Sequence, residues 1–410
     1  MKNGSNEWRR GWSTVFSGFA GVVFMTAVPT VTGLVMGPLM AEFGWSRAII
    51  TSNVLICSIF SMLLAPTLGS LIARFGVRRC ALTAVIAAAP ALGLISLTGG
   101  SPVTWIAAWT LFAVINVGIS PMVWSGAVAA LFDRARGMAL AVTLSGSGVA
   151  YFVFPPLAVA VLQSFGWRAV YLVIAALMIV VLLPLVYALF RGPLDLNRTR
   201  MPQPGLQAAG PSEGFTLSQA LHTRQFWQFI AVAALMALAE GALHVHLFPI
   251  LQEGGLSAAS AAWVASFMGI AMIVGRILAG FMQDRLPPLP VFGSSILVVL
   301  VSCVALRFFN GGVGMGLVAS ICLGLGTGGT TIGLANLTSR YFGLAAYPSI
   351  FGLLMGGFSL GYGVAPVVAG HFREVTASYL PIFDWLAAAL LIAVVLAWLI
   401  GKPRMTLRAA

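Results

Sequence analysis

The sequence predicts an all-α membrane protein whose twelve transmembrane helices form two pseudo-symmetric six-helix bundles. Of its 410 residues, 60% are hydrophobic and 8% are charged, and its mean hydropathy is +0.99. Soluble domains carry about 25% charged residues, so this chain could not cover its surface with polar groups in water. A spanning helix needs ~20 apolar residues, and about twelve such helices fit the chain. One long hydrophilic stretch divides the apolar runs into two equal sets.

The predicted spans are the apolar runs between clusters of charge. The N-terminal bundle, residues 1–190, has spans at 11–39, 47–73, 80–98, 103–130, 137–162 and 167–190. The C-terminal bundle, residues 225–410, has spans at 225–250, 257–283, 289–308, 312–338, 346–370 and 376–400. Between them, residues 191–224 are rich in proline, glycine and polar side chains, which predicts a cytoplasmic linker. The first run is about twice as long as a signal-peptide core, so we expect it to remain as a helix.

The positive charges are distributed unequally between the two sides of the membrane. If both termini are cytoplasmic, Arg276 lies inside a span and four other arginines lie on the opposite side of the membrane. All the remaining lysines and arginines lie on the cytoplasmic side. Those four are Arg47, Arg168, Arg307 and Arg373. Short loops follow this positive-inside bias, which predicts a multi-pass protein of the cell inner (plasma) membrane. The same bias, together with lipid headgroups, explains the net charge of +12 without a nucleic-acid partner.

The two sets of spans contain an internal repeat. Gly69 and Arg74 recur 211 residues later as Gly280 and Arg285, since 280 minus 69 is 211. Two homologous halves of this kind are typical of transporters that rock around a site near the membrane midplane.

The segment after the second span carries a recognisable motif. Gly69, Leu71, Arg74, Gly76 and Arg78 follow the pattern GxLxDRxGxR, with alanine at position 73 in place of the usual aspartate. Through this motif and the repeat, the chain resembles the major facilitator superfamily from its first span to its twelfth. In that family the loop latches one conformational state. The resemblance therefore implies a latch formed by the following residues: Gly69, Arg74, Arg78, Asp284 and Arg285.

Within that superfamily, the chain is similar to bacterial monocarboxylate porters and oxalate/formate antiporters. The segments that carry this similarity include EFGWSRA at 42–48, FGWRAVY at 165–171, HLFPILQEGGLS at 246–257, GRILAGFMQDR at 275–285 and RYFGLAAYPSIFGLL at 340–354. The resemblance implies a secondary transporter of small organic carboxylates that works by alternating access.

Arg276 is the first candidate for substrate binding. A charged residue near the centre of a spanning helix costs at least ~2.5 kcal/mol, so a compensating interaction is expected. Its planar guanidinium matches a carboxylate held through two hydrogen bonds. Monocarboxylate porters place a substrate-binding arginine at the matching point of the eighth helix, and the resemblance extends this role to Arg276. The alternative is that Arg276 snorkels or pairs towards the cytoplasmic side.

Glu240 and His244 are the candidates for proton coupling. Glu240 is the only carboxylate near the middle of a predicted span, and His244 follows four residues later on the same helical face. Desolvation favours the neutral form of a carboxyl group, and histidine titrates near neutral pH, so the pair could take up and release a proton. The alternative is a Glu–His hydrogen bond that only packs the seventh helix.

Further substrate-binding candidates are polar residues inside spans. They are Thr26, Thr30, Asn116, Asn336 and His246. Asparagines in spans also stitch helices together, which is the alternative for both amides. The four cysteines lack metal-ligand spacing, and no set of catalytic residues is seen, so we expect neither a metal site nor an enzyme.

These observations predict proton-coupled symport of a small organic monocarboxylate by a monomer embedded in lipid. A proton gradient would drive it, without a cofactor. Two alternatives stay open, a carboxylate anion exchanger and proton-coupled efflux of amphipathic drugs. The sequence does not identify the carboxylate.

Overall fold

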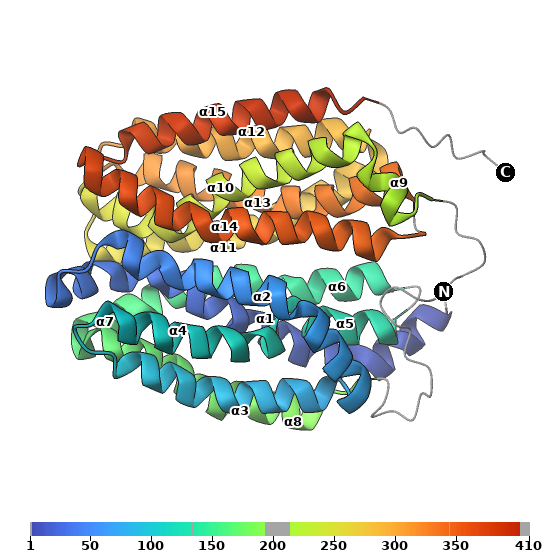
Figure 1. Ribbon diagram of the computed structural model, residues 1–410, viewed down its shortest axis with the longest axis horizontal. Coiled ribbons are helices and arrows are strands. Elements are labelled where there is room, and N and C mark those ends of the chain that lie inside the picture. The colour runs from blue at the N-terminus through green and yellow to red at the C-terminus, as the bar shows by residue number, and fades with distance from the viewer. Residues whose placement is uncertain (1, 133–134, 193–213, 344, 402–410) are drawn as a thin grey trace.

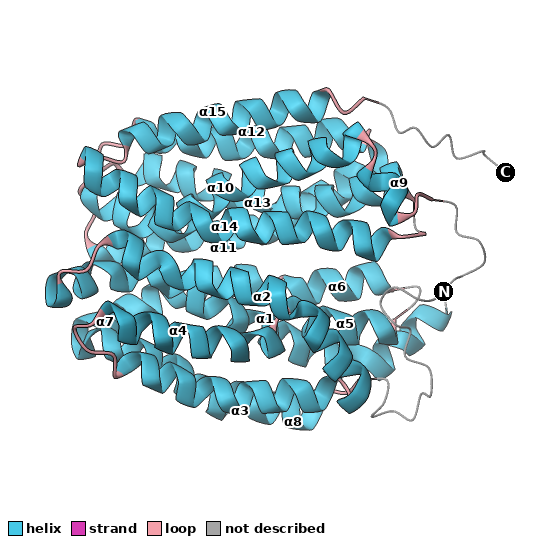
Figure 2. Ribbon diagram, in the orientation of Figure 1, coloured by secondary structure: helices cyan, strands magenta, loops and turns pink. Residues whose placement is uncertain are grey.

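The computed structural model describes residues 2–132, 135–192, 214–343 and 345–401, and every regular element in these ranges is a helix (Figures 1 and 2). The N-terminal half contains these helices: α1 (Lys2–Phe43), α2 (Arg47–Phe75), α3 (Val77–Ser96), α4 (Pro102–Asn116), η1 (Val117–Ile119), α5 (Pro121–Leu131), α6 (Arg136–Leu144), α7 (Gly146–Leu177), η2 (Met178–Leu182) and α8 (Leu183–Leu189). The C-terminal half contains these: α9 (Leu217–Leu221), α10 (Arg224–Glu253), α11 (Ala258–Arg285), α12 (Pro288–Arg307), α13 (Val313–Phe342), α14 (Tyr347–Thr376) and α15 (Leu380–Trp398).

The described helices cross a membrane twelve times, as predicted. Eleven stretches are long and apolar enough to span, and one of them, Arg136–Leu189, has 54 residues. At 1.5 Å per residue that stretch would measure about 80 Å, far more than the ~30 Å of a hydrocarbon core. It is broken at Gly166, whose φ of 79° and ψ of 174° lie outside the helical region. Glycine adopts a positive φ without steric cost, so the chain turns back there and crosses a second time.

The predicted linker, residues 191–224, lies largely outside the described residues, and the domain boundaries stay a prediction. The predicted fourth span, 103–130, contains an interruption that the sequence analysis did not include. There α4 ends at Asn116, and Pro121 begins α5 after the short η1 turn. The buried indole of Trp124 donates to the carbonyl oxygen of Ile119 at 2.7 Å and so satisfies a backbone acceptor at the break.

Each half packs its helices side by side, and the two halves lie next to each other with their helices running in the same general direction (Figure 1). We call the end at which α1 begins and α15 ends the terminal end, and the opposite end the far end. The N-terminal half has an aromatic core towards the far end, in which Trp105 lies 5.6 Å from Trp109 and 6.4 Å from Tyr171 between ring centroids.

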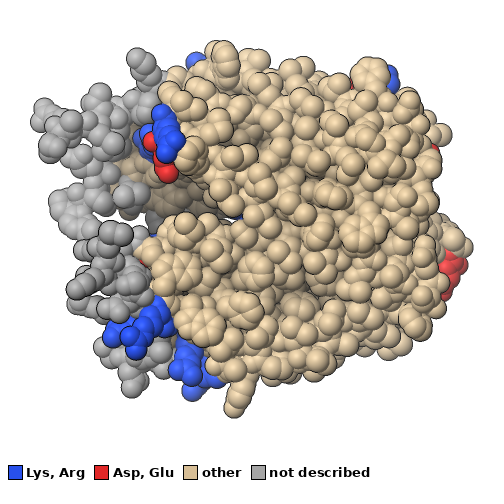
Figure 3. Space-filling view, turned by 180° about the vertical axis from the view of Figure 1, so that it is seen from behind, with Lys and Arg blue, Asp and Glu red and all other residues tan. Residues whose placement is uncertain are grey.

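The two halves are in contact towards the far end. Gly33 of α1 approaches α10 so closely that a Cβ on it would lie 2.0 Å from the carbonyl oxygen of Val245. At the terminal end, by contrast, the space-filling view is hollowed between the halves (Figure 3). The structure is therefore closed at the far end and open at the terminal end.

Four ion pairs join described residues, and all four lie at the far end. They are Arg47–Glu253 at 2.9 Å, Arg373–Glu253 at 2.9 Å, Arg168–Glu42 at 2.7 Å and Arg307–Asp384 at 3.1 Å. Their arginines are the four that the charge distribution assigned to the side opposite the termini. Each of these arginines is thus paired with a carboxylate at the far end.

One set of these charges connects the two halves, and we call it the far-end network: Arg47, Glu253, Arg373 and Glu374. Arg47, at the start of α2, belongs to the N-terminal half and the other three to the C-terminal half. Its guanidinium pairs with Glu253, and its backbone amide donates to the carboxylate of Glu374. The Arg373–Glu253 pair, in contrast, lies within one half.

Candidate functional site

Arg276 lies at the interface between the two halves. It belongs to α11, and its guanidinium reaches α6 and α7 of the other half, donating to the carbonyl oxygen of Leu144 at 2.6 Å. The Ser147 hydroxyl lies 3.4 and 3.5 Å from its two terminal nitrogens. Only 9% of Arg276 is exposed, and its Nε has no hydrogen-bond partner among the described residues. Its positive charge is therefore held by neutral acceptors, with no carboxylate in ion-pair contact in the described part of the chain.

The Leu144 carbonyl is available because the helical hydrogen bonding is interrupted at this point. Helix α6 ends at Leu144 and α7 begins at Gly146. The amide of Gly148, which would bond to Leu144 in a continuous α-helix, instead donates to the carbonyl of Ser145 at 3.1 Å. The Ser147 hydroxyl donates to the freed Leu144 oxygen at 2.9 Å, and Arg276 donates a second hydrogen bond to the same oxygen. The break thus supplies the acceptor that the buried guanidinium uses.

The backbones of α7 and α11 touch on the far-end side of Arg276. A Cβ on Gly269 would lie 2.1 Å from the carbonyl oxygen of Gly148, and a Cβ on Gly148 would lie 2.5 Å from that of Gly269. This close approach requires glycine at both positions, because a side chain at either one would clash with the facing backbone.

A cluster of polar side chains lies nearby, within the same interface. We call it the tyrosine–histidine cluster: Tyr151 from α7, His244 from α10, Thr327 from α13 and Tyr362 from α14. His244 Nδ1 lies 3.4 Å from the Tyr151 hydroxyl and 3.1 Å from the Tyr362 hydroxyl, and the two hydroxyls are 3.2 Å apart. On its other side, His244 Nε2 lies 3.3 Å from the Thr327 hydroxyl. His244 was a candidate from the sequence, whereas its three partners were not.

Glu240 is buried one helical turn from His244, as the i, i+4 spacing predicted. It is 1% exposed and accepts a hydrogen bond from the Thr330 hydroxyl at 2.9 Å. Among the described residues Glu240 forms neither a direct hydrogen bond with His244 nor an ion pair. The two residues are instead joined through α13, because Thr330 and Thr327 stand three residues apart on that helix.

Thr30 is the predicted polar residue of α1 that reaches this cluster. Its side chain lies beside the Tyr151 hydroxyl. Its own hydroxyl donates to the backbone carbonyl of Thr26 at 2.7 Å. Both threonines are buried, and no hydrogen bond from the Thr26 side chain to a described residue is seen.

The remaining predicted binding residues lie apart from Arg276. Asn336 donates to Gln283 at 2.7 Å and accepts from Arg340 at 3.2 Å, which links α13 to α11 towards the terminal end. Both ring nitrogens of His246 are engaged, at 2.9 Å from the Tyr379 hydroxyl and 2.9 Å from the carbonyl oxygen of Pro366. Asn116 is half-buried at the end of α4, and its side chain bonds to no described residue. None of the three is brought to the guanidinium by a described contact.

The residues of the predicted latch lie at the terminal end and make contacts within their own halves. Arg78 of α3 donates to the carbonyl oxygen of Tyr187 in α8. The guanidinium of Arg74 lies 5.1 Å from the ring centre of Phe75, and that of Arg285 lies 3.9 Å from that of Phe281. Asp284 and Gly69 connect to no described residue of the other half through an ion pair or hydrogen bond. The open terminal end agrees with this arrangement, and a latch in another state stays a prediction.

Comparison with known proteins covers both halves. The family model described as Major Facilitator Superfamily matches residues 11–254 and 234–409. Monocarboxylate transporter 13 of Bos taurus is 25% identical over 386 residues, which span 93% of this chain and 87% of that protein. The uncharacterized MFS-type transporter YhjX of Escherichia coli K12 is 23% identical, over 72% of this chain and 71% of its own length. Monocarboxylate transporter 11 of Homo sapiens is 26% identical over 62% of this chain and 54% of its own length.

Proposed function

Because this chain belongs to the major facilitator superfamily of membrane transporters, we propose that it carries a small organic monocarboxylate together with a proton. Transport follows alternating access, in which the space between the halves opens first to one side of the membrane and then to the other. Arg276 binds the carboxylate, and Glu240 with His244 takes up the proton.

The observation that carries the substrate class is the unpaired charge of Arg276. Among the described residues, the Nε of this buried guanidinium has no partner and its other nitrogens contact only neutral acceptors, so the charge is poorly compensated. A carboxylate would supply both the missing charge and a second hydrogen bond, and such bidentate pairs are among the strongest polar contacts in proteins. One guanidinium neutralises one carboxylate, which favours a monoanion.

The contacts of Arg276 also suggest how binding is coupled to the rearrangement of the halves. In the present state the guanidinium bridges α11 to the break between α6 and α7. An incoming carboxylate competes with the Leu144 carbonyl for the same N–H groups. A ligand shifts a conformational equilibrium only through its different affinity for the two states. Replacing a bond between the halves by a bond to substrate provides such a difference.

Thr330 gives Glu240 a partner for both of its protonation states. The single hydroxyl hydrogen of Thr330 can point to Glu240, at 2.9 Å, or to the carbonyl oxygen of Thr327, at 3.0 Å. An ionised Glu240 accepts that hydrogen, whereas a protonated Glu240 donates its own hydrogen to the Thr330 oxygen. A monoanion that moves with one proton transfers no net charge, so transport should be electroneutral.

The charge distribution supports the orientation in the membrane. All four far-end arginines are neutralised by carboxylates, whereas the predicted spans assign most lysines and arginines of the sequence to the side of the termini. We therefore place the termini in the cytoplasm and the protein in the inner membrane.

Uptake into proteoliposomes tests the proton coupling. Wild-type protein should accumulate a monocarboxylate faster when the outside is acidic. Glu240→Gln keeps a hydrogen-bonding side chain of the same size but cannot titrate. We expect its pH-driven rate of uptake to be at least tenfold lower than that of the wild type. Exchange of labelled for unlabelled substrate should be retained.

Asp384→Asn is the matched control for this loss, because it removes a carboxyl group from an exposed ion pair at the far end, where such pairs contribute little. It should behave as the wild type. If Glu240→Gln responds to the pH gradient as strongly as the wild type, Glu240 is not the coupling residue. A wild type that exchanges anions but never responds to the gradient would support the exchanger instead.

A further inference from the structure

The tyrosine–histidine cluster contains more hydrogen-bonding capacity than its own contacts use. The three distances among Tyr151, Tyr362 and His244 are 3.1, 3.2 and 3.4 Å. Bonds from hydroxyl groups are commonly 2.7–2.8 Å long, so these contacts are loose. The two phenol oxygens have four lone pairs, and the trio supplies at most three hydrogens, so at least one phenol lone pair is left unfilled. A further polar group could therefore bind between them.

Two members of this cluster are partly exposed although they lie within the interface between the halves. His244 and Tyr362 stand near the middle of long helices, yet both keep an intermediate degree of exposure. Tyr151 and Thr327 are each 6% exposed. The cluster thus keeps two partly exposed side chains, and it is composed of residues from both halves.

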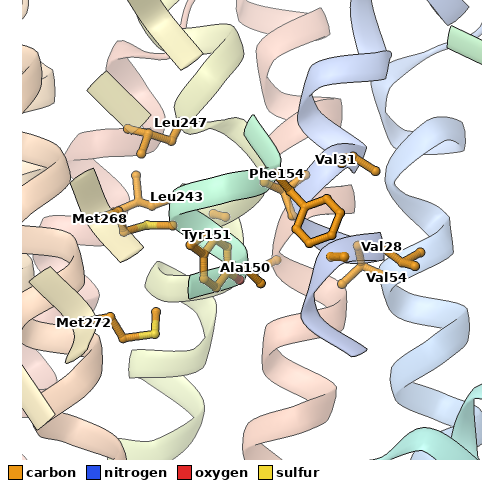
Figure 4. Close-up of a cluster of buried hydrophobic side chains, with 14 of the residues drawn as sticks. Val28, Val31, Val54, Ala150, Tyr151, Phe154, Leu243, Leu247, Met268 and Met272 are labelled. Carbon is orange, nitrogen blue, oxygen red and sulfur yellow. The ribbon is translucent and has the colours of Figure 1, made fainter. Parts of the chain in front are cut away.

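The spacing between the cluster and Arg276 can be read along α7. Ser147 contacts the guanidinium and Tyr151 contacts His244. These two residues are four positions apart on one helical face, about 6 Å along the axis. Met272 of α11 lies beside Ser147, whose hydroxyl donates to the methionine sulfur at 3.7 Å. Figure 4 shows Met268 and Met272 on the helix that faces Tyr151.

We infer that the tyrosine–histidine cluster binds a second polar group of the transported acid. The substrate is then a monocarboxylate with a hydroxyl or carbonyl oxygen at the opposite end of a short apolar skeleton, of which a para-hydroxylated aromatic acid is the simplest example. This inference rests on the proposed function, because it takes Arg276 as the carboxylate site. It adds a recognition element at the other end of the molecule.

Such a ligand would contact Arg276 of the C-terminal half at one end and a cluster with residues from both halves at the other. Its carboxylate takes the N–H groups of Arg276 that now bond to Leu144 and Ser147. Its distal hydroxyl donates to His244 Nδ1 or accepts from the Tyr151 or Tyr362 hydroxyl. The methionines pack against the apolar skeleton between these ends. An acid that carries its hydroxyl next to the carboxylate would leave the cluster unbound.

Binding of simple aromatic acids to the purified full-length protein tests this inference. The probes are benzoate, 2-hydroxybenzoate and 4-hydroxybenzoate, and the measurement is the dissociation constant from calorimetry or from ligand-dependent thermal stability. A neutral hydrogen bond contributes about 0.5–1.5 kcal/mol, so 4-hydroxybenzoate should bind roughly two- to tenfold more tightly than benzoate. The 2-hydroxy isomer should show no such gain.

Tyr151→Phe and Tyr362→Phe remove one hydroxyl each from the cluster. We expect either variant to reduce the preference for 4-hydroxybenzoate over benzoate to less than twofold and to leave benzoate binding unchanged. Tyr171→Phe is the matched control, since its buried hydroxyl has no hydrogen-bond partner among the described residues. It should keep the full preference.

Three results would overturn the inference. Equal affinity for benzoate and 4-hydroxybenzoate would mean that the tyrosine–histidine cluster does not bind a second polar group of the acid. An equal loss of both ligands in both phenylalanine variants assigns the tyrosines a structural role only. A preference that survives both variants places the recognition of the hydroxyl elsewhere. If no carboxylic acid binds at all, the proposed function itself fails, which is a different outcome.

Discussion

Arg276→Ala is expected to weaken carboxylate binding by about 100-fold or more and to abolish saturable uptake. Hydrogen bonds to charged groups contribute about 1.5–3 kcal/mol each, so losing a bidentate pair costs about 3–6 kcal/mol. Each 1.4 kcal/mol corresponds to a tenfold change in affinity. Arg276→Lys keeps the charge but presents a single ammonium in place of the planar fork. It should bind at least tenfold more weakly than the wild type.

The measurement is the dissociation constant of a monocarboxylate together with uptake into proteoliposomes. Arg307→Ala is the control, since Arg307 is exposed at the end of α12 and pairs with Asp384. It should leave binding within twofold of the wild type. If Arg276→Ala binds and transports the acid normally, the guanidinium serves only to join α11 to Leu144, and the acid-carrier proposal is wrong.

The sequence was sufficient to predict the twelve crossings and the burial of Arg276, because both depend on the cost of placing charge in hydrocarbon. Only the number of charges and their spacing along the chain enter that argument. The sequence did not indicate that Leu144 would accept from Arg276. That contact depends on a helix break between Leu144 and Gly146, and the run from 137 to 162 contains no charged residue that would mark a break.

Helical periodicity correctly predicted that Glu240 and His244 share one face, but it could not identify what that face meets. Their partners come from α7, α13 and α14, and Tyr151 and Tyr362 are 211 residues apart in the chain. The sequence around a lone tyrosine in an apolar run does not indicate which residues contact it in the folded protein. The far-end network was missed for the same reason, because Arg47 and Glu253 come from different halves.

Arg47→Ala is expected to raise the population open at the far end about tenfold. Arg47 supplies the ion pair that joins the two halves, and its side chain is only 15% exposed, against 35% for Glu253. Exposed pairs contribute about 0–1 kcal/mol, and a partly buried pair exceeds that range because water screens it less. A change of about 1.4 kcal/mol in the equilibrium between the two states is a factor of ten. The backbone amide of residue 47 still donates to Glu374. The variant therefore weakens the contact between the halves at the far end but keeps this hydrogen bond across it.

A cysteine behind the far-end network measures this population. Met36 is 1% exposed and lies one turn beyond Gly33, where α1 touches α10. In a background with all four native cysteines replaced, Met36→Cys should react with a bulky maleimide about ten times faster when Arg47 is alanine.

Arg373→Ala is the decisive comparison, because it removes a pair with the same Glu253 but within the C-terminal half. We expect that the contact between the halves closes the far end and that neutralisation of Glu253 alone does not. Arg373→Ala should therefore leave the labelling rate within twofold of the wild type. Equal acceleration in both variants would instead mean that the charge balance around Glu253 controls closure and that the contact between the halves has no special role.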